Sequence, residues 1–346
     1  MNISLCLHME RTGTEETHRQ LYEEFIELCT IADKGGFHTI WTGEHHGMEF
    51  SITPNPLLLL SDLASKTKNV RLGTATLIAP FWHPIRLAGE IAITDVITNG
   101  RLDIGLSKGA YTYEYDRLKP GVNEVSSGEM MREMIPTIIN LWKGDYSHDG
   151  KYWKFPSTIS APLPIQKPHP PIWVACQHPY TFNFAVENSC NVQVAPLWNG
   201  DEEVENLINT FETTLESHPE LNIPKIMILR HTFIAETEEE LVRASEDFSD
   251  FYCEFSSWFK NERPVQNGVL EPLSKEEKAK MDIFSAEKLR NNLMIGTPDQ
   301  IINRLKKYEA LGYDEYSVWI ANGMSFETKK AFLKLFIDKV IPVFCN

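Results

Sequence analysis

Short apolar runs alternate with longer stretches of helical spacing along most of the chain. The first run, residues 2–7, is followed over residues 17–34 by apolar side chains at Leu21, Phe25 and Leu28. That spacing is typical of an amphipathic helix, and the Gly-Gly pair that follows it is a helix end signal. The same order of strand and helix recurs, which indicates parallel strands joined by helical crossovers.

The alternation predicts eight strands and eight helices. Eight parallel strands are enough to close a β/α barrel, so we predict an α/β fold, a single (β/α)8 TIM barrel with insertions over residues 1–346. An open doubly wound sheet is the alternative, but it would need a G-x-G-x-x-G turn after the first strand, and residues 8–14 have none. The expected strands are 2–7, 37–42, 69–78, 101–106, 171–175, 191–196, 225–235 and 314–320, and the expected helices are 17–34, 55–66, 84–97, 180–188, 201–216, 237–259, 298–310 and 325–340.

Two segments interrupt the alternation. Residues 143–170 are rich in proline, glycine and aromatic side chains, and they predict a loop with a small hairpin around Tyr146–Phe155. Residues 260–286 are polar and charged and contain two prolines and a glycine. A long loop in a compact domain usually covers a site or lacks fixed structure, so a lid is the expectation here.

Composition and charge narrow the classes of partner. The net charge is -15, without a lysine or arginine cluster, so neither nucleic acid nor an anionic membrane is an expected partner. The N-terminus does not resemble a signal peptide, and apolar runs such as Leu57–Leu60 are too short to cross a bilayer. The six cysteines match no zinc or disulfide framework. A cytoplasmic protein with reduced thiols is therefore expected.

The strongest chemical signal is Glu44-His45-His46, which directly follows the predicted strand 37–42. Chemistry in a β/α barrel lies at the carboxyl ends of the strands, and histidine exchanges protons near neutral pH. A metal site is not expected, because neighbouring residues on an extended chain point opposite ways and H-E-x-x-H is absent. A structural alternative has Glu44 pairing with the backbone or a basic group while a histidine caps the next helix.

Two further segments follow strands. Small residues at 74–76 would let a flat ligand approach the backbone, but they would equally suit a tightly packed core. Lys108, between small residues of the segment 105–111, could hold a phosphate or simply be solvated. Aromatic residues are frequent near these strand ends, which suits a planar ligand or an apolar substrate.

These segments together resemble a known family. FHTIWTGEHH, TKNVRLGTATLIAPFWHP and TNGRLDIGLSKGAY, with IGTPDQIINRL near the C-terminus, are similar to the bacterial luciferase-like flavin monooxygenases. The match covers residues 1–125 well and 290–345 loosely. It implies a barrel that binds reduced FMN supplied by a separate flavin reductase. Reaction with O2 through a C4a-peroxyflavin would then oxygenate a small organic substrate. A homodimer is implied as well.

The resemblance also implies roles for individual residues. His45 matches the family's catalytic histidine, and Glu44 matches the acidic residue beside the flavin. Ala75-Thr76 matches the site of a non-proline cis peptide bond under the isoalloxazine ring. These residues are therefore expected to form the catalytic and ring-binding part of the site.

Other positions depart from the family pattern. Ser107 stands where luciferases carry a cysteine close to the flavin, and Lys108 stands where they carry a phosphate-binding arginine. Cys176-Gln177 replaces a Glu-Ser pair that helps to hold the ring and phosphate. A second phosphate-binding arginine has no obvious equivalent, and Arg132 is the nearest candidate. All four substituted positions are still expected at the cofactor site.

Two other functions stay open on the sequence. A deazaflavin (F420) oxidoreductase that transfers hydride would share the barrel, and so would a non-catalytic flavin-binding protein. The substrate is not specified, because aldehydes, ketones, aromatics and sulfur compounds would all fit an aromatic-rich pocket.

Overall fold

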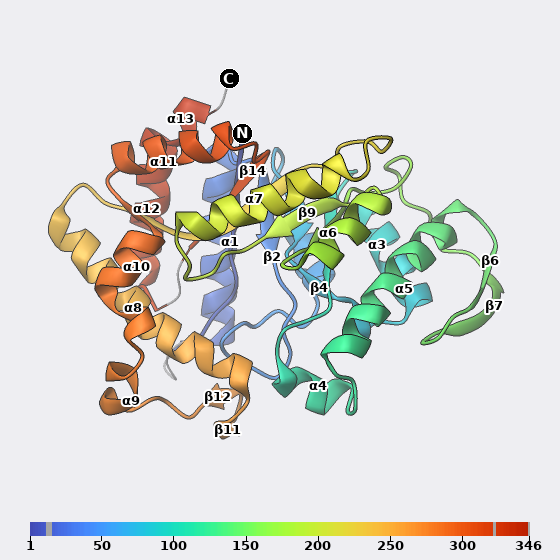
Figure 1. Ribbon diagram of the computed structural model, residues 1–346, viewed down its shortest axis with the longest axis horizontal. Coiled ribbons are helices and arrows are strands. Elements are labelled where there is room, and N and C mark those ends of the chain that lie inside the picture. Colours follow the sequence, from blue (N-terminus) through green and yellow to red (C-terminus); the bar gives the residue numbers. More distant parts are fainter. Residues whose placement is uncertain (12–15, 321–322, 345–346) are drawn as a thin grey trace.

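Eight parallel strands form a closed barrel surrounded by helices in the computed structural model (Figure 1), which describes residues 1–11, 16–320 and 323–344. All eight predicted strands are present, so the predicted barrel is confirmed. They are β1 (Asn2–Cys6), β2 (Thr39–Thr42), β3 (Arg71–Thr74) with its continuation β4 (Leu77–Ile78), β5 (Leu102–Ser107), β8 (Ile172–Ala175), β9 (Asn191–Val194), β10 (Ile226–Ile234) and β14 (Glu315–Trp319).

Strand β10 closes the ring. Its first residues pair with β9, Ile226 opposite Val192, and its next residues pair with β14, His231 opposite Trp319. Strand β14 in turn pairs along its whole length with β1. A short strand that the sequence pattern did not predict, β13 (Met294–Gly296), pairs with the carboxyl end of β10. The last barrel strand, β14, therefore has two neighbours, β1 and β10, that are both far from it in the sequence.

The predicted helices are present, and further ones lie between them. The predicted set is α1 (His18–Lys34), α2 (Pro56–Ala64), α3 (Pro84–Ile97), α6 (Pro179–Glu187), α7 (Asp201–Glu216), α8 (Glu238–Lys260), α11 (Pro298–Ala310) and α12 (Phe326–Lys339). Those not predicted are α4 (Thr112–Leu118), α5 (Glu124–Lys143), α9 (Lys275–Ala279), α10 (Ala286–Asn292) and α13 (Ile341–Phe344), with 3-10 turns η1 (Ala79–Phe81) and η2 (Asp282–Phe284). The longest of these, α5, contains an internal proline, which ordinarily argues against a helix.

The strand predicted over 69–78 is wrong in one respect, because it is broken between β3 and β4. The peptide bond between Ala75 and Thr76 is cis, as the family resemblance implies. The break is held from both sides, because the N–H of Ala75 donates to the Thr42 carbonyl (2.8 Å) and the Thr76 carbonyl accepts from the N–H of Glu44 (3.0 Å). The loop after β2 is thereby tied to the break in β3–β4.

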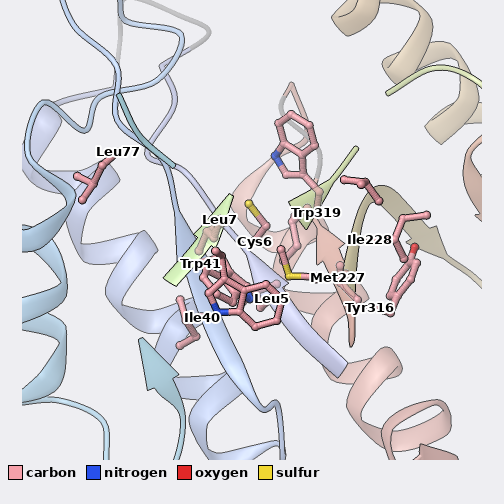
Figure 2. Packing of buried hydrophobic residues seen from close by; sticks show 14 of the residues in the cluster. Leu5, Cys6, Leu7, Ile40, Trp41, Leu77, Met227, Ile228, Tyr316 and Trp319 are labelled. Carbon is pink, nitrogen blue, oxygen red and sulfur yellow. The ribbon is translucent and has the colours of Figure 1, made fainter. Parts of the chain in front are cut away.

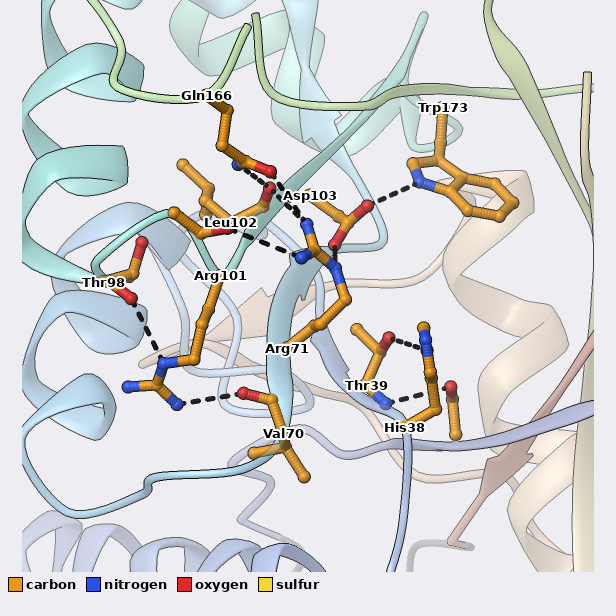
Figure 3. Close-up of polar contacts among 12 residues, drawn as sticks. His38, Thr39, Val70, Arg71, Thr98, Arg101, Leu102, Asp103, Gln166 and Trp173 are labelled. Atoms are coloured by element: carbon orange, nitrogen blue, oxygen red, sulfur yellow. Dashed lines mark hydrogen bonds and ion pairs between the residues drawn. The ribbon is translucent and has the colours of Figure 1, made fainter. Parts of the chain in front are cut away.

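Buried polar side chains fill the amino-terminal part of the barrel, and apolar ones fill the middle. Glu315 accepts hydrogen bonds from Ser4 (2.6 Å) and from the Trp41 indole (2.8 Å). Asp103 bridges Arg71 and the Trp173 indole (Figure 3). Above these, apolar and aromatic side chains from β1, β2, β10 and β14 pack together (Figure 2). The interior is thus a packed core rather than a channel.

Both insertions are folded. The predicted hairpin is present as β6 (Tyr146–Asp149) and β7 (Lys154–Thr158). Residues 260–286, expected as a loop, contain the hairpin β11 (Val265–Gln266) and β12 (Val269–Leu270) as well as α9 and η2. The turn of this hairpin accepts a hydrogen bond at the Gly268 carbonyl from the Glu49 N–H (2.8 Å). It therefore docks on the loop that follows β2, at the same edge of the molecule as α4 (Figure 1).

Two findings concern the helices and the cysteines. Within residues 1–11, 16–320 and 323–344, none of the helices is both long and apolar enough to span a bilayer. The described cysteines are all free and buried, namely Cys6, Cys29, Cys176, Cys190 and Cys253.

Candidate active site

The loop between β2 and α2 lies over the carboxyl ends of the strands and borders a cavity of about 330 Å³. The hairpin turn of β11–β12 forms the other side of this cavity, so the segment predicted to be a lid covers part of it. The lining residues are His45, Gly47, Met48, Glu49, Ser51, Ile52, Pro54, Asn267 and Gly268. His45 is the one residue of the Glu-His-His triplet among them.

Glu44 holds the loop together from a buried position. Its Oε2 accepts from the N–H of Ile78 (2.7 Å) and from the indole of Trp82 (2.9 Å). Its Oε1 lies 2.7 Å from the Nε2 of His46. Glu44 thus pairs with the backbone and with His46, as the structural alternative for the triplet expected. The helix cap expected from a histidine is instead supplied by Asn55, at the start of α2.

His45 and His46 are both fixed by Glu114, a buried residue of α4 that the sequence pattern did not single out. The Glu114 Oε2 lies 3.4 Å from His45 Nδ1, and its Oε1 accepts from the backbone N–H of His46 (2.7 Å). The His45 ring also contacts Tyr111, with ring centres 5.1 Å apart. A carboxylate from another strand's loop thus sets the orientation of the predicted catalytic imidazole.

The pKa of His46 is raised, whereas the pKa of the nearby His8 is lowered. Burial lowers the pKa of His46, but the bond to Glu44 and the charges of Glu44 and Glu114 outweigh it, so that this pKa is raised. Burial and the positive charge of His45 lower the pKa of His8 to about 3. His8 is consequently neutral, and its Nδ1 accepts the N–H of Gly43 (3.3 Å).

Small side chains at three neighbouring strand ends form a flat floor. A side chain on Gly43 would place its Cβ 2.8 Å from the Ala75 carbonyl oxygen, so only glycine fits between β2 and β3. The Thr76 hydroxyl donates to the Ser107 hydroxyl (2.6 Å), which accepts from the N–H of Gly109 (3.2 Å). Ala75, Thr76 and Ser107, predicted from the resemblance, are therefore side by side.

The expected phosphate-binding side chains lie beyond this floor. Lys108 follows Ser107 and is ion-paired with Glu124 at the amino end of α5. Arg132 lies about two turns further along α5, and its guanidinium stacks on the ring of Tyr180, 4.6 Å from the ring centre. An arriving phosphate would therefore compete with Glu124 for Lys108.

Cys176 and Gln177 end strand β8 on the same side. The Cys176 thiol is buried and contacts the Val174 carbonyl (3.4 Å), and burial holds its pKa well above the usual range. Gln177 is exposed. The cysteine is thus an unreactive packing residue, and of this pair only the amide side chain is available to a ligand.

The opposite wall of the barrel mouth is aromatic. His231 of β10 and Trp319 of β14 stack with ring centres 3.8 Å apart and an angle of 17° between the planes. Phe251 and Phe255 of α8 pack on them, and Phe50 of the loop after β2 packs on both phenylalanines. The predicted strand 314–320 contains Trp319 near its end, but nothing in the sequence pattern pointed to His231 or to the aromatic face of α8.

Comparison with known proteins decides the family. The model of the luciferase-like monooxygenases matches residues 1–315. This chain belongs to the luciferase-like monooxygenase family. The resemblance stated from the sequence is confirmed, and so is the prediction of a monooxygenase fold.

Relatives extend over the whole of this luciferase-like monooxygenase. It is 56% identical over 344 residues to the oxygenase component of the flavin-dependent trigonelline monooxygenase of Acinetobacter baylyi, which covers 99% of this chain and 96% of that protein. It is 24% identical to the alkanal monooxygenase alpha chain of Photobacterium leiognathi, over 99% and 98% of the two chains. A crystal structure of a monooxygenase from Streptomyces bottropensis superposes with a TM-score of 0.84 at 23% identity over both full chains.

The floor side of the mouth fits a flavin in shape and chemistry. A flat ring needs a wall without projecting side chains, which Gly43, Ala75 and Ser107 provide. A phosphate needs a cation, which Lys108 provides at the end of the same floor. The site residues predicted in the first half of the barrel are therefore brought together, with Glu114 added to them by the fold.

Proposed function

We propose that this chain is the oxygenase component of a two-component flavin-dependent monooxygenase that acts on trigonelline or a closely related N-methylated pyridine carboxylate. The 56% identity over nearly the full length of both proteins is the observation that carries the proposal. Trigonelline is a planar aromatic ring with a fixed positive charge and a carboxylate. The aromatic wall formed by Trp319, Phe251 and Phe255 is suited to such a ring.

Reduced FMN would be held on the floor by Ala75, Thr76 and Ser107, with Lys108 at its phosphate. When bound it supplies the electrons that activate O2 for insertion into the substrate. His45 then exchanges the proton that accompanies this step, because it is the ionisable side chain of the triplet that lines the cavity. The β11–β12 hairpin keeps water from the cavity when it rests on Glu49.

A deazaflavin oxidoreductase would have the same fold, but a shared fold does not by itself favour that function. A secondary alcohol dehydrogenase that uses the deazaflavin coenzyme superposes with a TM-score of 0.77 at 15% identity. Likeness at that identity concerns the barrel alone, and unrelated chemistries share barrels. The full-length relative at 56% identity is described as flavin-dependent, which favours FMN.

The test is substrate consumption with reduced FMN. The purified chain is mixed anaerobically with reduced FMN and trigonelline, then with O2, and the loss of trigonelline is measured by chromatography. One equivalent of substrate should be lost per reduced flavin. Oxidation of the flavin with stoichiometric hydrogen peroxide and unchanged trigonelline would contradict the proposal. The same experiment with a reduced deazaflavin serves as the matched comparison.

A separate flavin reductase is the proposed protein partner, because the related protein is an oxygenase component. We place both proteins in the cytoplasm, where unpaired thiols such as the buried cysteines of this chain stay reduced. Omitting the reductase from a mixture of NADH, FMN and trigonelline should abolish turnover, and adding any flavin reductase should restore it.

We also propose a homodimer through the outer faces of α2 and α3. The Asn55 amide bonds the Glu90 carboxylate (3.2 Å), and one turn beyond them Leu58 and Ile93 are 71% and 43% exposed. Ile97, about one turn further along α3, is exposed as well. An apolar patch of this kind often marks a protein interface. Replacing Ile93 by Glu should convert a dimer to a monomer in light-scattering measurements, whereas Ile223→Glu, at an exposed isoleucine elsewhere, should not.

A further inference from the structure

Two buried ring nitrogens at the aromatic wall have no hydrogen-bond partner within the described residues. They are the Nε2 of His231 and the Nε1 of Trp319, from side chains that are 1% and 8% exposed as whole residues. A buried polar atom without a partner is costly, so it usually awaits a ligand or water. The two rings are stacked at 3.8 Å, and both belong to the inner face of the barrel.

The chemistry of both atoms is that of a donor. An indole nitrogen can only donate. The other nitrogen of His231, Nδ1, lies 2.5 Å from the Tyr252 hydroxyl. Burial raises the pKa of Tyr252, so this hydroxyl keeps its proton and can donate it to Nδ1. Burial, with the positive charge of Arg230, holds the pKa of His231 well below its usual range, so the ring is neutral. With Tyr252 as the donor to Nδ1, the one ring proton is on Nε2.

The wall lies one aromatic layer from the cavity that His45 lines. Phe50, whose chain neighbours Glu49 and Ser51 border that cavity, packs on Phe255 with ring centres 5.5 Å apart. Phe255 packs edge-on against Trp319 at 6.2 Å. In Figure 2 the indole nitrogen of Trp319 is on the side of the ring away from Ile228. The aromatic layer of Phe50 and Phe255 thus separates the two N–H groups from the cavity, and a ligand that reaches them has to displace one of these side chains.

We propose that Trp319 Nε1–H and His231 Nε2–H together hold the carboxylate of the aromatic substrate, on the side of the mouth opposite the flavin floor. This inference rests on the proposed function for the identity of the substrate. Two parallel rings at van der Waals separation can direct one N–H to each carboxylate oxygen. The faces of Phe251 and Phe255 then contact the positively charged ring. In this arrangement uncharged N–H donors bind the carboxylate, so the site needs no protein cation, which would repel the positively charged ring of the substrate.

The test compares acids with matched amides in binding rather than turnover. Ligands are trigonelline and nicotinate, against 1-methylnicotinamide, methylated on the ring nitrogen, which keeps the ring and the positive charge of trigonelline but lacks the carboxylate. Titration calorimetry is done with wild-type protein carrying FMN and with Trp319→Phe, which keeps the aromatic face and removes the N–H. The same exchange at Trp153, a buried indole of the β6–β7 region, is the control.

Trp319→Phe should bind both acids about 10- to 100-fold more weakly, as expected for a lost hydrogen bond to a charged group, and should bind the amide and FMN as the wild type does. Tyr252→Phe removes the hydroxyl beside Nδ1, so that the proton of His231 can lie on either ring nitrogen. This variant should bind the acids only a few fold more weakly. Equal losses for acid and amide would overturn the proposal. So would weakened FMN binding, because the donors would then belong to the flavin, or failure of the wild type to bind either acid. If the acids bind with this contrast but trigonelline is not consumed, the anchor stands and the proposed function fails.

Discussion

The Nδ1 atom of His45 lies 3.4 Å from the Oε2 atom of Glu114, although 69 residues separate the two in the chain. The other oxygen of the same carboxylate accepts the backbone N–H of His46. One buried side chain of α4 therefore fixes both the ring and the main chain of the segment after β2.

Replacing His45 by Ala should lower kcat by about 10²- to 10⁴-fold, because a positioned acid or base contributes that much. FMN binding should change little, since the contacts proposed for the ring and phosphate, from Ala75, Thr76, Ser107 and Lys108, lie at the ends of β3 and β5. Rapid mixing of reduced flavin, substrate and O2 measures the rate. His218→Ala, at a histidine that follows α7 and is bonded to Asn183, is the control. A variant at position 45 with full activity would remove His45 from the mechanism.

Replacing Glu114 by Gln should lower kcat by about 10-fold, less than the loss of the imidazole itself. Gln keeps an oxygen for the His46 N–H but not the negative charge beside His45. The KM for the substrate should stay the same, because Glu114 acts through His45. A rise in KM with unchanged kcat would mean that Glu114 holds the substrate instead.

The pair of Glu44 and His46 should make stability depend on pH. The pKa of His46 is raised in the folded chain, so its contribution is fully present below its ordinary value of 6.5 and is lost as the pH rises through the raised value. Glu44→Gln should lower the free energy of unfolding at pH 6 by about 1–3 kcal/mol and should flatten this dependence. Urea unfolding at several pH values measures both effects. An unchanged slope would show that the pair is not coupled in this way.

Glu315 should act in the same sense at the amino end of the barrel, because its pKa is raised as well. Burial raises its pKa from 4.5 to about 7, against the hydrogen bonds from Ser4 and Trp41. The folded chain thus keeps a proton that the unfolded chain releases, so stability falls as the pH rises from 4.5 to about 7, by about 3 kcal/mol. Glu315→Gln, which has no charge to bury, should lose this fall and be the more stable form at pH 8. A variant that is equally destabilised at pH 5 and pH 8 would contradict the assignment.

The role of Lys108 is tested by flavin affinity. Lys108→Ala should weaken FMN binding by about 10-fold and leave riboflavin binding unchanged, because only FMN carries the phosphate. Glu124→Gln should strengthen FMN binding, since it removes the carboxylate that is paired with Lys108. Fluorescence titrations of the flavin measure both. Equal losses for FMN and riboflavin in the alanine variant would place the phosphate elsewhere.

The barrel and half of the candidate site follow from local sequence signals. Strands and helices could be predicted because apolar residues recur with the period of each element, and their ends carry glycine and proline. Glu44, His45 and Lys108 could be singled out because they stand just after predicted strands, and the resemblance to the family added Ala75, Thr76 and Ser107. Parallel strands of a barrel end at one mouth, so position along the strand is enough to bring such residues together.

The rest was decided by tertiary structure. Glu114 reaches His45 only because α4 folds back over the loop after β2, and the internal Pro136 obscured helix α5 next to it in the chain. His231 and Trp319 meet because β10 and β14 are neighbours in the closed ring, although their residue numbers differ by 88 (319 − 231). A hydrophobic pattern describes each strand's inner face but carries no information on which strand will lie beside it. That is fixed by closure of the barrel, which depends on all eight strands at once.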